Sequence, residues 1–258
     1  MIRPWLDVWQ YRELLRALIE RELKARYRRS FFGFLWSLIT PLYQIVGVTF
    51  VVKVLWRHPE PNFSVKYLCA LLPWTLFQNG LLNSCASILR NRDIIKRVAF
   101  PRQVLPLAAV GGNLFHFLLS MVVLFIVFLI IPVRFSPMFL FLLVLLAILL
   151  VMVIGLGLLL STLHTWYQDV EYALGNLLQV YFFLSPVMYP ASWVPKEYQA
   201  LYLLNPMALI CEGFRSVLLQ QRPPDPLYVG LAAAFAALCF VVGQTVFMHQ
   251  QRRFPEII

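Results

Sequence analysis

The chain has 258 residues, of which 60% are hydrophobic and only 13% are charged, and its formal net charge is +10 at pH 7. Soluble domains are usually about half apolar and about a quarter charged, so this composition excludes an ordinary soluble domain. It predicts an integral membrane protein, in which the basic residues must be interpreted by their positions beside the apolar segments.

Residues 5–28 have the pattern of an amphipathic helix. Apolar side chains recur at helical spacing from Val8 to Tyr27, and charged side chains such as Arg16 and Lys24 fill the opposite side. Such a helix lies along the membrane interface, with its basic face toward anionic headgroups or a partner protein. The alternative is a simple surface anchor. Residues 1–34 are too charged for a secretory signal, so we expect a cytoplasmic N-terminus.

Six segments are predicted to cross the membrane, because a spanning helix needs roughly 20 mostly apolar residues. Their approximate ranges are 34–55, 67–89, 104–131, 138–161, 172–189 and 227–249. Residues 1–33 then form a cytoplasmic interface helix and elbow, residues 34–249 form one transmembrane domain, and residues 250–258 form a cytoplasmic tail. The predicted fold class is an all-α membrane protein.

The segment before the last span is predicted to enter the membrane and return. Residues 201–219 are long enough to cross, but they contain Pro206, Glu212 and Arg215. Each such charge costs about 2.5–3.5 kcal/mol near the bilayer centre. Residues 186–226 also hold seven of the chain's 17 prolines. We therefore expect a re-entrant, extracytoplasmic helical hairpin over residues 190–226, shielded by protein or water.

The distribution of basic residues supports six spans with both termini in the cytoplasm. In that arrangement the inner segments hold 15 of the 22 Lys and Arg residues. This bias agrees with the positive-inside rule. The dense basic stretch near residue 26 is thus explained by membrane orientation, and no nucleic-acid partner is predicted.

The inner loop at residues 90–102 predicts a short amphipathic helix, within residues 91–100. Asn91 or Asp93 can cap this helix, and Pro101 ends it. Ile94, Ile95 and Val98 give it an apolar side. Such a helix suits docking into a groove on another protein. An ordinary basic loop is the alternative.

No enzyme motif is found in the sequence. It contains no P-loop, no H-E-x-x-H and no G-x-S-x-G pattern, and its four cysteines lack metal-ligand spacing, so no catalytic residue, metal or bound cofactor is predicted.

A membrane enzyme acting on a lipid-linked sugar would have Asp169 and Glu171 as its best acid and base. An ion-coupled transporter would need buried carboxylates and an internal repeat. Asn113 and His116, within one predicted span, form either a functional pair or an interhelical hydrogen bond.

Five segments carry a family resemblance: "RELKARYRRSFFGFLWSLITPL", "LLPWTLF", "IIKRVAFPRQVLP", "YFFLSPVMYP" and "LLNPMALICEGFRSVLL". In this order and spacing they resemble the ABC-2-type permeases that export polysaccharides, most of all O-antigen exporters, with teichoic-acid and capsule exporters close behind. The chain departs from the family at Phe32, where Leu usually precedes the glycine.

The resemblance implies a homodimer in the bacterial inner membrane, bound to two separate ATPase subunits that hold ATP and Mg²⁺. It also implies a substrate built on an undecaprenyl-pyrophosphate-type lipid. Four sets of residues receive roles from it. The ATPase-coupling helix would contain Asp93, Ile94, Ile95, Lys96, Arg97 and Val98, and the entrance for the lipid pyrophosphate would contain Arg26, Arg28, Arg29 and Gly33. The glycan conduit would contain Tyr43, Trp74, Phe77, Tyr181, Phe182 and Phe183. The outer gate would contain Pro186, Pro190, Asn205, Pro206 and Arg215.

The conduit and entrance roles agree with the chemistry of these side chains. Aromatic rings offer sugar C–H groups a negative face and a weakly hydrogen-bonding wall. Guanidinium groups match phosphate oxygens in pairs. For each aromatic residue taken singly, the alternative is an ordinary core or lipid-facing position.

Overall fold

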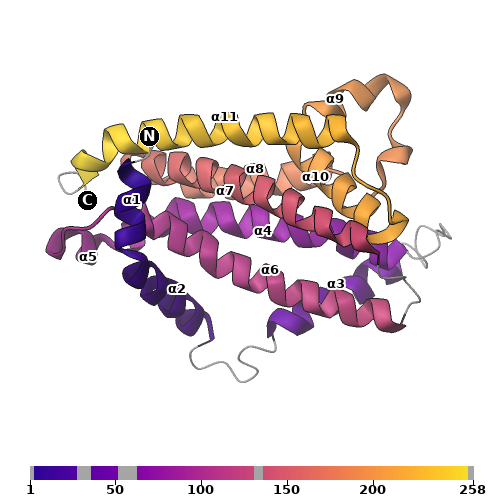
Figure 1. Cartoon of the computed structure of the whole chain (residues 1–258), viewed down its shortest axis with the longest axis horizontal. Coiled ribbons are helices and arrows are strands. Elements are labelled where there is room, and N and C mark those ends of the chain that lie inside the picture. Colours follow the sequence, from indigo (N-terminus) through magenta and orange to yellow (C-terminus); the bar gives the residue numbers. More distant parts are fainter. Residues whose placement is uncertain (1–2, 28–35, 52–62, 131–135, 255–258) are drawn as a thin grey trace.

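The computed structural model describes residues 3–27, 36–51, 63–130 and 136–254, and all regular structure in these ranges is helical, as predicted. Six helices lie side by side as an elongated bundle (Figure 1). They are α3 (Trp36–Phe50), α4 (Phe63–Arg90), α6 (Val104–Ile130), α7 (Phe141–Trp166), α8 (Val170–Leu184) and α11 (Pro226–Gln250).

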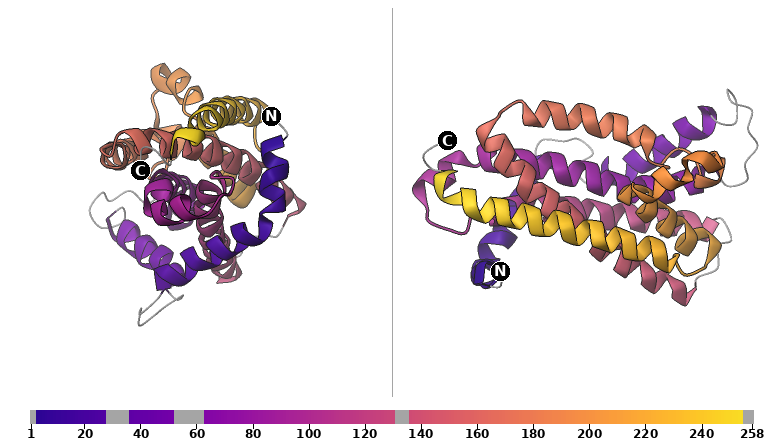
Figure 2. Two further views of the ribbon diagram at one scale, coloured as in Figure 1. Left: turned by 90° about the vertical axis from the view of Figure 1, so that its left-hand side faces the viewer. Right: turned by 90° about the horizontal axis from the view of Figure 1, so that it is seen from above.

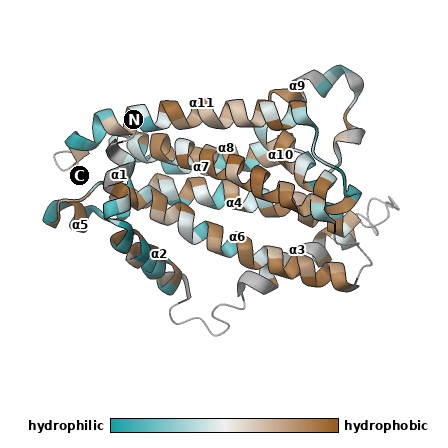
Figure 3. Cartoon of the chain, in the orientation of Figure 1, coloured by the Kyte–Doolittle hydropathy of each residue, from teal (hydrophilic) through white to brown (hydrophobic). Residues whose placement is uncertain are grey.

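The other helices gather at the two ends of the bundle. One end, hydrophilic in Figure 3, carries α1 (Arg3–Gln10), α2 (Arg12–Tyr27) and α5 (Arg92–Arg97), and the opposite end carries α9 (Gln199–Leu203) and α10 (Pro206–Arg215). The remaining short elements are the 3-10 turns η3 (Pro137–Leu140), η4 (Ala191–Trp193), η5 (Lys196–Tyr198) and η7 (Gln251–Arg253), and one π-helical turn, η6 (Ser216–Gln220).

Among the described residues, three helices are long and apolar enough to cross a membrane. They cover Val104–Leu129, Pro137–Trp166 and Pro226–Arg253, and they coincide with three of the six predicted spans. Helix α4 has 28 residues but a polar face, while α3 and α8 have 15 residues each. Helix α8 ends at Leu184, five residues before the predicted end, because the residue before Pro186 is extended.

Helix α4 lies at the centre of the bundle. It contacts α3, α6, α7, α8 and α10, and side chains such as Leu68, Leu72 and Cys85 are fully buried in these contacts. Pro73 lies inside α4 and removes one helical hydrogen bond, since proline has no N–H. The surrounding helices therefore hold α4 in place where its own hydrogen bonding is weakened.

Helices α7 and α11 approach each other closely at two glycines. A Cβ atom added to Gly155 would lie 2.5 Å from backbone atoms of Phe240, and one added to Gly243 would overlap the carbonyl oxygen of Gly155. In membranes, small residues at a helix interface let backbones approach and gain dispersion energy, because the hydrophobic effect does not drive helices together there. The α7–α11 contact is such an interface.

The N-terminal amphipathic segment consists of two helices, whereas one was predicted. The break is at Tyr11, whose N–H donates to the carbonyl oxygen of Val8 in a tight turn. The helices wrap around the end of the bundle, as the left view of Figure 2 shows. Val8 on α1 and Leu18 on α2 are both buried against it. The break allows both helices to keep their apolar sides on the curved end of the bundle.

The α7–α11 contact yields a stability prediction. Gly243→Ala places a methyl group against the Gly155 carbonyl and should lower the free energy of unfolding by about 1–3 kcal/mol, the usual cost of overpacking. Thermal unfolding of the purified chain in detergent measures the change. Gly230→Ala is the matched control, because Gly230 lies on the same helix with no heavy atom within 4 Å of its added Cβ. Equal melting temperatures for the two variants would contradict the close contact.

Candidate functional site

Helix α5 displays charges at the end of the bundle where both described termini lie. Ile95 is its buried anchor, whereas Asp93, Lys96 and Arg97 are exposed. Asp93 lies in the first turn and the two basic residues in the last, where each stabilises the helix dipole. Ile94 is half-buried, and Val98, which follows the helix, is 55% exposed. This geometry leaves most of α5 open to a partner.

Arg21 ties α2 to the start of α5. Its guanidinium donates to the side-chain oxygen of Asn91, and the Asn91 amide donates to the Ser87 carbonyl oxygen at 2.7 Å. Ile95 also shares a small hydrophobic cluster with Leu18 and Phe254. The N-terminal helices, the end of α4, α5 and the C-terminal turn therefore pack as one unit. The sequence analysis missed the Arg21–Asn91 contact, because their separation of 70 residues leaves no local pattern.

The residues assigned to the entrance fall at the edge of the described part of the chain. Helix α2 ends at Tyr27, so the backbone of Arg26 lies in its last turn. The Arg26 side chain, Arg28, Arg29 and Gly33 lie outside the described residues. Their role stays a prediction.

Four of the six residues assigned to the conduit form one aromatic cluster between α4 and α8. The ring centroid of Trp74 lies 5.6 Å from that of Tyr181 and 5.4 Å from that of Phe182, and Phe77 lies 6.0 Å from Tyr181. Trp74 and Phe77 are only 2% and 4% exposed. Within one chain these rings contact each other, so their conduit role stays a prediction.

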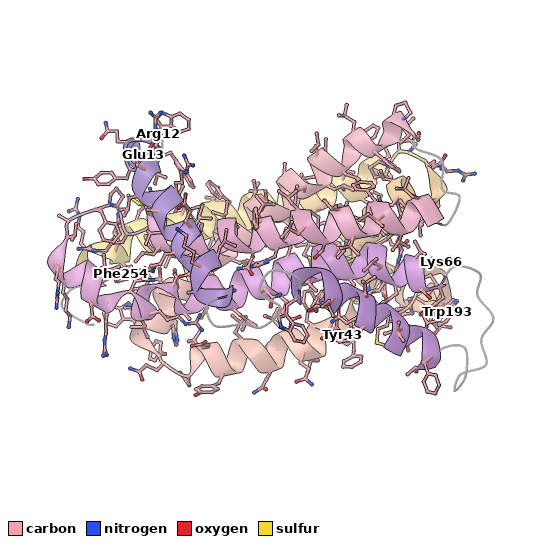
Figure 4. All side chains as sticks on the ribbon, turned by 90° about the horizontal axis from the view of Figure 1, so that it is seen from below. Arg12, Glu13, Tyr43, Lys66, Trp193 and Phe254 are labelled. Atoms are coloured by element: carbon pink, nitrogen blue, oxygen red, sulfur yellow. The ribbon has the colours of Figure 1, made fainter. Side chains whose placement is uncertain are left out.

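The other two conduit residues are more exposed: the ring of Phe183 lies at the edge of this cluster, 5.4 Å from that of Phe182, and Tyr43 lies on another helix. Tyr43 on α3 and Phe183 on α8 are both more than half exposed. Figure 4 shows Tyr43 on the side of the bundle formed by α3. An exposed aromatic side chain on a membrane helix can meet lipid or a second protein chain.

Arg215 is the centre of the end of the bundle that carries α9 and α10. Only 5% exposed, it donates to the Glu212 carboxylate at 2.7 Å and to the carbonyl oxygens of Lys66, Val187 and Tyr189 at 2.9–3.1 Å. The guanidinium thus joins α10 to the start of α4 and to the segment after α8. A buried cation is tolerated here because it is paired and hydrogen-bonded.

The Asn205 side chain also joins separate segments at this end of the bundle. Its side-chain oxygen caps α10 by accepting from the Ala208 N–H at 3.1 Å and also accepts from the Tyr181 hydroxyl at 2.6 Å. Its amide group donates to the Ser185 hydroxyl oxygen at 3.1 Å. Pro206 occupies the first position of α10, where its missing N–H costs nothing.

Two prolines lie in the segment between α8 and η4. Pro186 is buried just after α8, and Pro190 precedes η4. The Tyr202 hydroxyl donates to that of Tyr189 at 2.7 Å, and burial, followed by this hydrogen bond, raises the pKa of Tyr202. The structure therefore brings the residues assigned to the gate to the same end of the bundle, where Arg215 and Asn205 make the side-chain hydrogen bonds.

Asn113 binds the neighbouring helix α4, as one of its two predicted alternatives requires. Its side-chain oxygen accepts from the Asn83 amide at 3.2 Å, and its own amide donates to the Ala109 carbonyl oxygen at 2.8 Å. Asn113 and His116 also line a cavity of about 520 Å³ between α3, α4 and α6. The sequence analysis did not predict this cavity, although Gln78, Asn79 and Asn83 stand out as polar residues in a predicted span.

The sequence of this chain is similar to one protein family and to several named proteins. The model of the family described as ABC-2 type transporter matches residues 13–219. The O-antigen export system permease protein RfbA of Myxococcus xanthus is 31% identical over the full length of both chains. The protein of the same name from Klebsiella pneumoniae is 28% identical over 95% of each chain. The polysialic acid transport protein KpsM of Escherichia coli is 21% identical over 91% of this chain and 92% of its own.

The Arg215 network yields a second prediction. Arg215→Met removes the donor for four acceptors and leaves Glu212 without its cation, so we expect a loss of about 3–5 kcal/mol in the free energy of unfolding. Thermal unfolding in detergent gives the measurement. Arg222→Met, an exposed cation in the same region, should change stability little. Similar stabilities of the two variants would show that the Arg215 contacts contribute nothing.

Proposed function

Since the chain belongs to the ABC-2 type transporter family, we propose that it is the permease subunit of an ATP-driven exporter that moves a lipid-linked, O-antigen-like polysaccharide out of the cytoplasm of a bacterium. The observation that carries this proposal is the similarity over the full length of both chains to a protein named as an O-antigen export permease. Relatives named for polysialic acid and capsule polysaccharide also match most of the chain, so a capsular glycan is the second candidate. Teichoic-acid export would use the same mechanism.

The proposed topology has six spans in the inner membrane, formed by α3, α4, α6, α7, α8 and α11, with both termini in the cytoplasm. Three of these helices are strongly apolar. Helix α4, at 28 residues, is about 42 Å long, which exceeds the roughly 30 Å of hydrocarbon in a bilayer. Arg12, Glu13 and Phe254 lie at one end of the bundle, and Lys66 and Trp193 at the other (Figure 4). This supports termini on one side and a re-entrant α9–α10 hairpin on the other.

The proposed source of energy is a separate ATPase chain that binds ATP and Mg²⁺. Two ATPases would bind a dimer of this chain through α5 and the N-terminal helices. The exposure of Asp93, Lys96 and Arg97 supports docking there, and the Arg21–Asn91 contact supports a joint movement of the two helical regions. A rigid docking surface transmits a displacement more directly than a loop does.

The proposed path of the substrate begins at the arginines after α2 and ends at the Arg215 network. Arg26, Arg28, Arg29 and Gly33 would receive the undecaprenyl-pyrophosphate-type head, because guanidinium groups pair well with phosphate. The glycan would then pass between two copies of the chain. The exposed rings of Tyr43 and Phe183 are available to such an interface, and the network around Arg215 would gate the exit.

A membrane enzyme acting on a lipid-linked sugar is the weaker hypothesis. Its best acid and base were Asp169 and Glu171. The two carboxylate oxygens of Glu171 lie 3.2 Å from Arg90 and 3.4 Å from Nε2 of His164. These two contacts join α8 to α4 and α7, which supports a packing role for Glu171.

A third prediction tests the docking of α5. Reversing the charges with Lys96→Glu and Arg97→Glu should reduce export by about tenfold or more, equivalent to about 1.4 kcal/mol of lost interaction with the ATPase. Export of glycolipid and ATP hydrolysis are measured in proteoliposomes with both subunits. Arg252→Glu and Arg253→Glu form the matched control, since both are exposed cations at the same end of the bundle. Equal export by the two double variants would remove the docking role.

A further inference from the structure

We propose that the cavity between α3, α4 and α6 binds uncharged sugar residues of the transported glycan, an assignment that rests on the proposed function. The cavity has a volume of about 520 Å³ and lies within a single chain. Helix α3 contacts both α4 and α6 in this part of the bundle (Figure 1). The site is thus separate from the aromatic cluster, which lies between α4 and α8.

The cavity lies at the middle depth of the bundle. Its polar lining includes Gln44 of α3, Asn79 of α4 and Ser120 of α6, none of which is within five residues of its helix end. Polar side chains at this depth of a membrane are expensive and usually mark a substrate path. The hydrogen bond between α6 and α4 explains why a polar residue stands at Asn113. It does not explain a cavity of this size, which the side chains of the three helices leave unfilled.

The hydrogen bonds of the lining residues define what the cavity can accept. The hydroxyls of Thr40, Thr75 and Ser120 donate to backbone carbonyl oxygens of their own helices. Their oxygen atoms retain lone pairs, so these three residues present acceptors to a ligand. A matching ligand must therefore bring hydrogen-bond donors.

The amide side chains add donors to these acceptors. The side-chain oxygen of Gln78 accepts from the Trp74 ring N–H at 3.0 Å, which leaves the Gln78 amide N–H groups as donors. Gln44 and Asn79 also line the cavity, with one donor and one acceptor group each. Sugar hydroxyls both donate and accept, and they fit this mixture.

The lining also distinguishes a sugar from the lipid that carries it. The described residues that line the cavity include no Lys, Arg, Asp or Glu. A pyrophosphate would need fixed cations, and an acyl or prenyl chain would leave the amides unsatisfied. Trp36 and Phe117 also line the cavity and can stack on sugar C–H faces. The chemistry therefore favours a neutral saccharide.

A second, smaller cavity extends this polar lining toward α2. It has a volume of about 20 Å³, enough for about one water molecule. Glu22 of α2, Asn83 of α4 and Gly112 of α6 line it, and it shares Asn113 and His116 with the larger cavity. The sugar site thus has a polar connection to the end of the bundle proposed to face the cytoplasm.

The test measures binding of two lipids to the full-length chain in nanodiscs of phosphatidylethanolamine and phosphatidylglycerol. One probe is undecaprenyl pyrophosphate carrying a neutral oligosaccharide, and the other is undecaprenyl pyrophosphate alone. The double variant Gln44→Leu with Asn79→Leu should bind the glycosylated lipid about tenfold more weakly, the cost of about two hydrogen bonds, and should bind the bare lipid as before. Thr75→Val, which keeps the side-chain shape, should lose about threefold and guards against misfolding of the double variant.

Asn176→Leu with Gln179→Leu is the matched control, because it removes the same two amides from exposed positions on α8. Unchanged binding of the glycosylated lipid by the cavity variants would overturn the proposal. So would an equal loss for both lipids, which would assign the cavity to the lipid, or an equal loss in the control. If the wild-type chain itself does not prefer the glycosylated lipid, the proposed function fails, and not the cavity assignment alone.

Discussion

Lipid chains are as apolar as leucine, so helices in a bilayer are held together by close packing and internal hydrogen bonds and not by expulsion of water. Both devices occur in this chain. Gly155 and Gly243 bring the backbones of α7 and α11 into contact, and Asn113 links α6 to α4. At the end of the bundle that carries α9 and α10, Arg215 joins α10 to the start of α4. The polar residues inside the bundle are therefore structural wherever they reach a partner on another segment.

The polar residues in the bundle are of two kinds, those whose hydrogen bonds hold segments together and those that line the cavity. Asn205 and Arg215 have several partners each, and their hydrogen bonds hold short segments that lack the length to be stable alone. Gln44 and Asn79, by contrast, line an open cavity. Transport requires groups that bind briefly and release, and residues whose hydrogen-bonding capacity is not consumed by the fold are suited to it.

Much of the fold could be predicted from the sequence. Long apolar segments specified α6, α7 and α11 to within a few residues at most ends, because length and hydropathy are local properties. The break at Tyr11 could not be predicted, since it depends on the curvature of the surface that α1 and α2 cover. The cavity could not be predicted either, because its walls depend on how three helices rotate against one another. The Arg21–Asn91 contact shows the same limit for residues far apart in the sequence.

Pro73 divides α4 into two parts. The part before Pro73 includes Lys66, whose carbonyl oxygen accepts a hydrogen bond from Arg215, and the part after it carries Thr75, Gln78 and Asn79 and leads to Asn91. A helix resists stretching but bends most easily at a proline. Bending at Pro73 would therefore move Thr75, Gln78 and Asn79 of the cavity wall together with the end of the bundle that carries α5, while Lys66 stays bound to Arg215. In the proposed exporter, a movement at α5 would thus reach the cavity before it reaches the hydrogen bonds of Arg215.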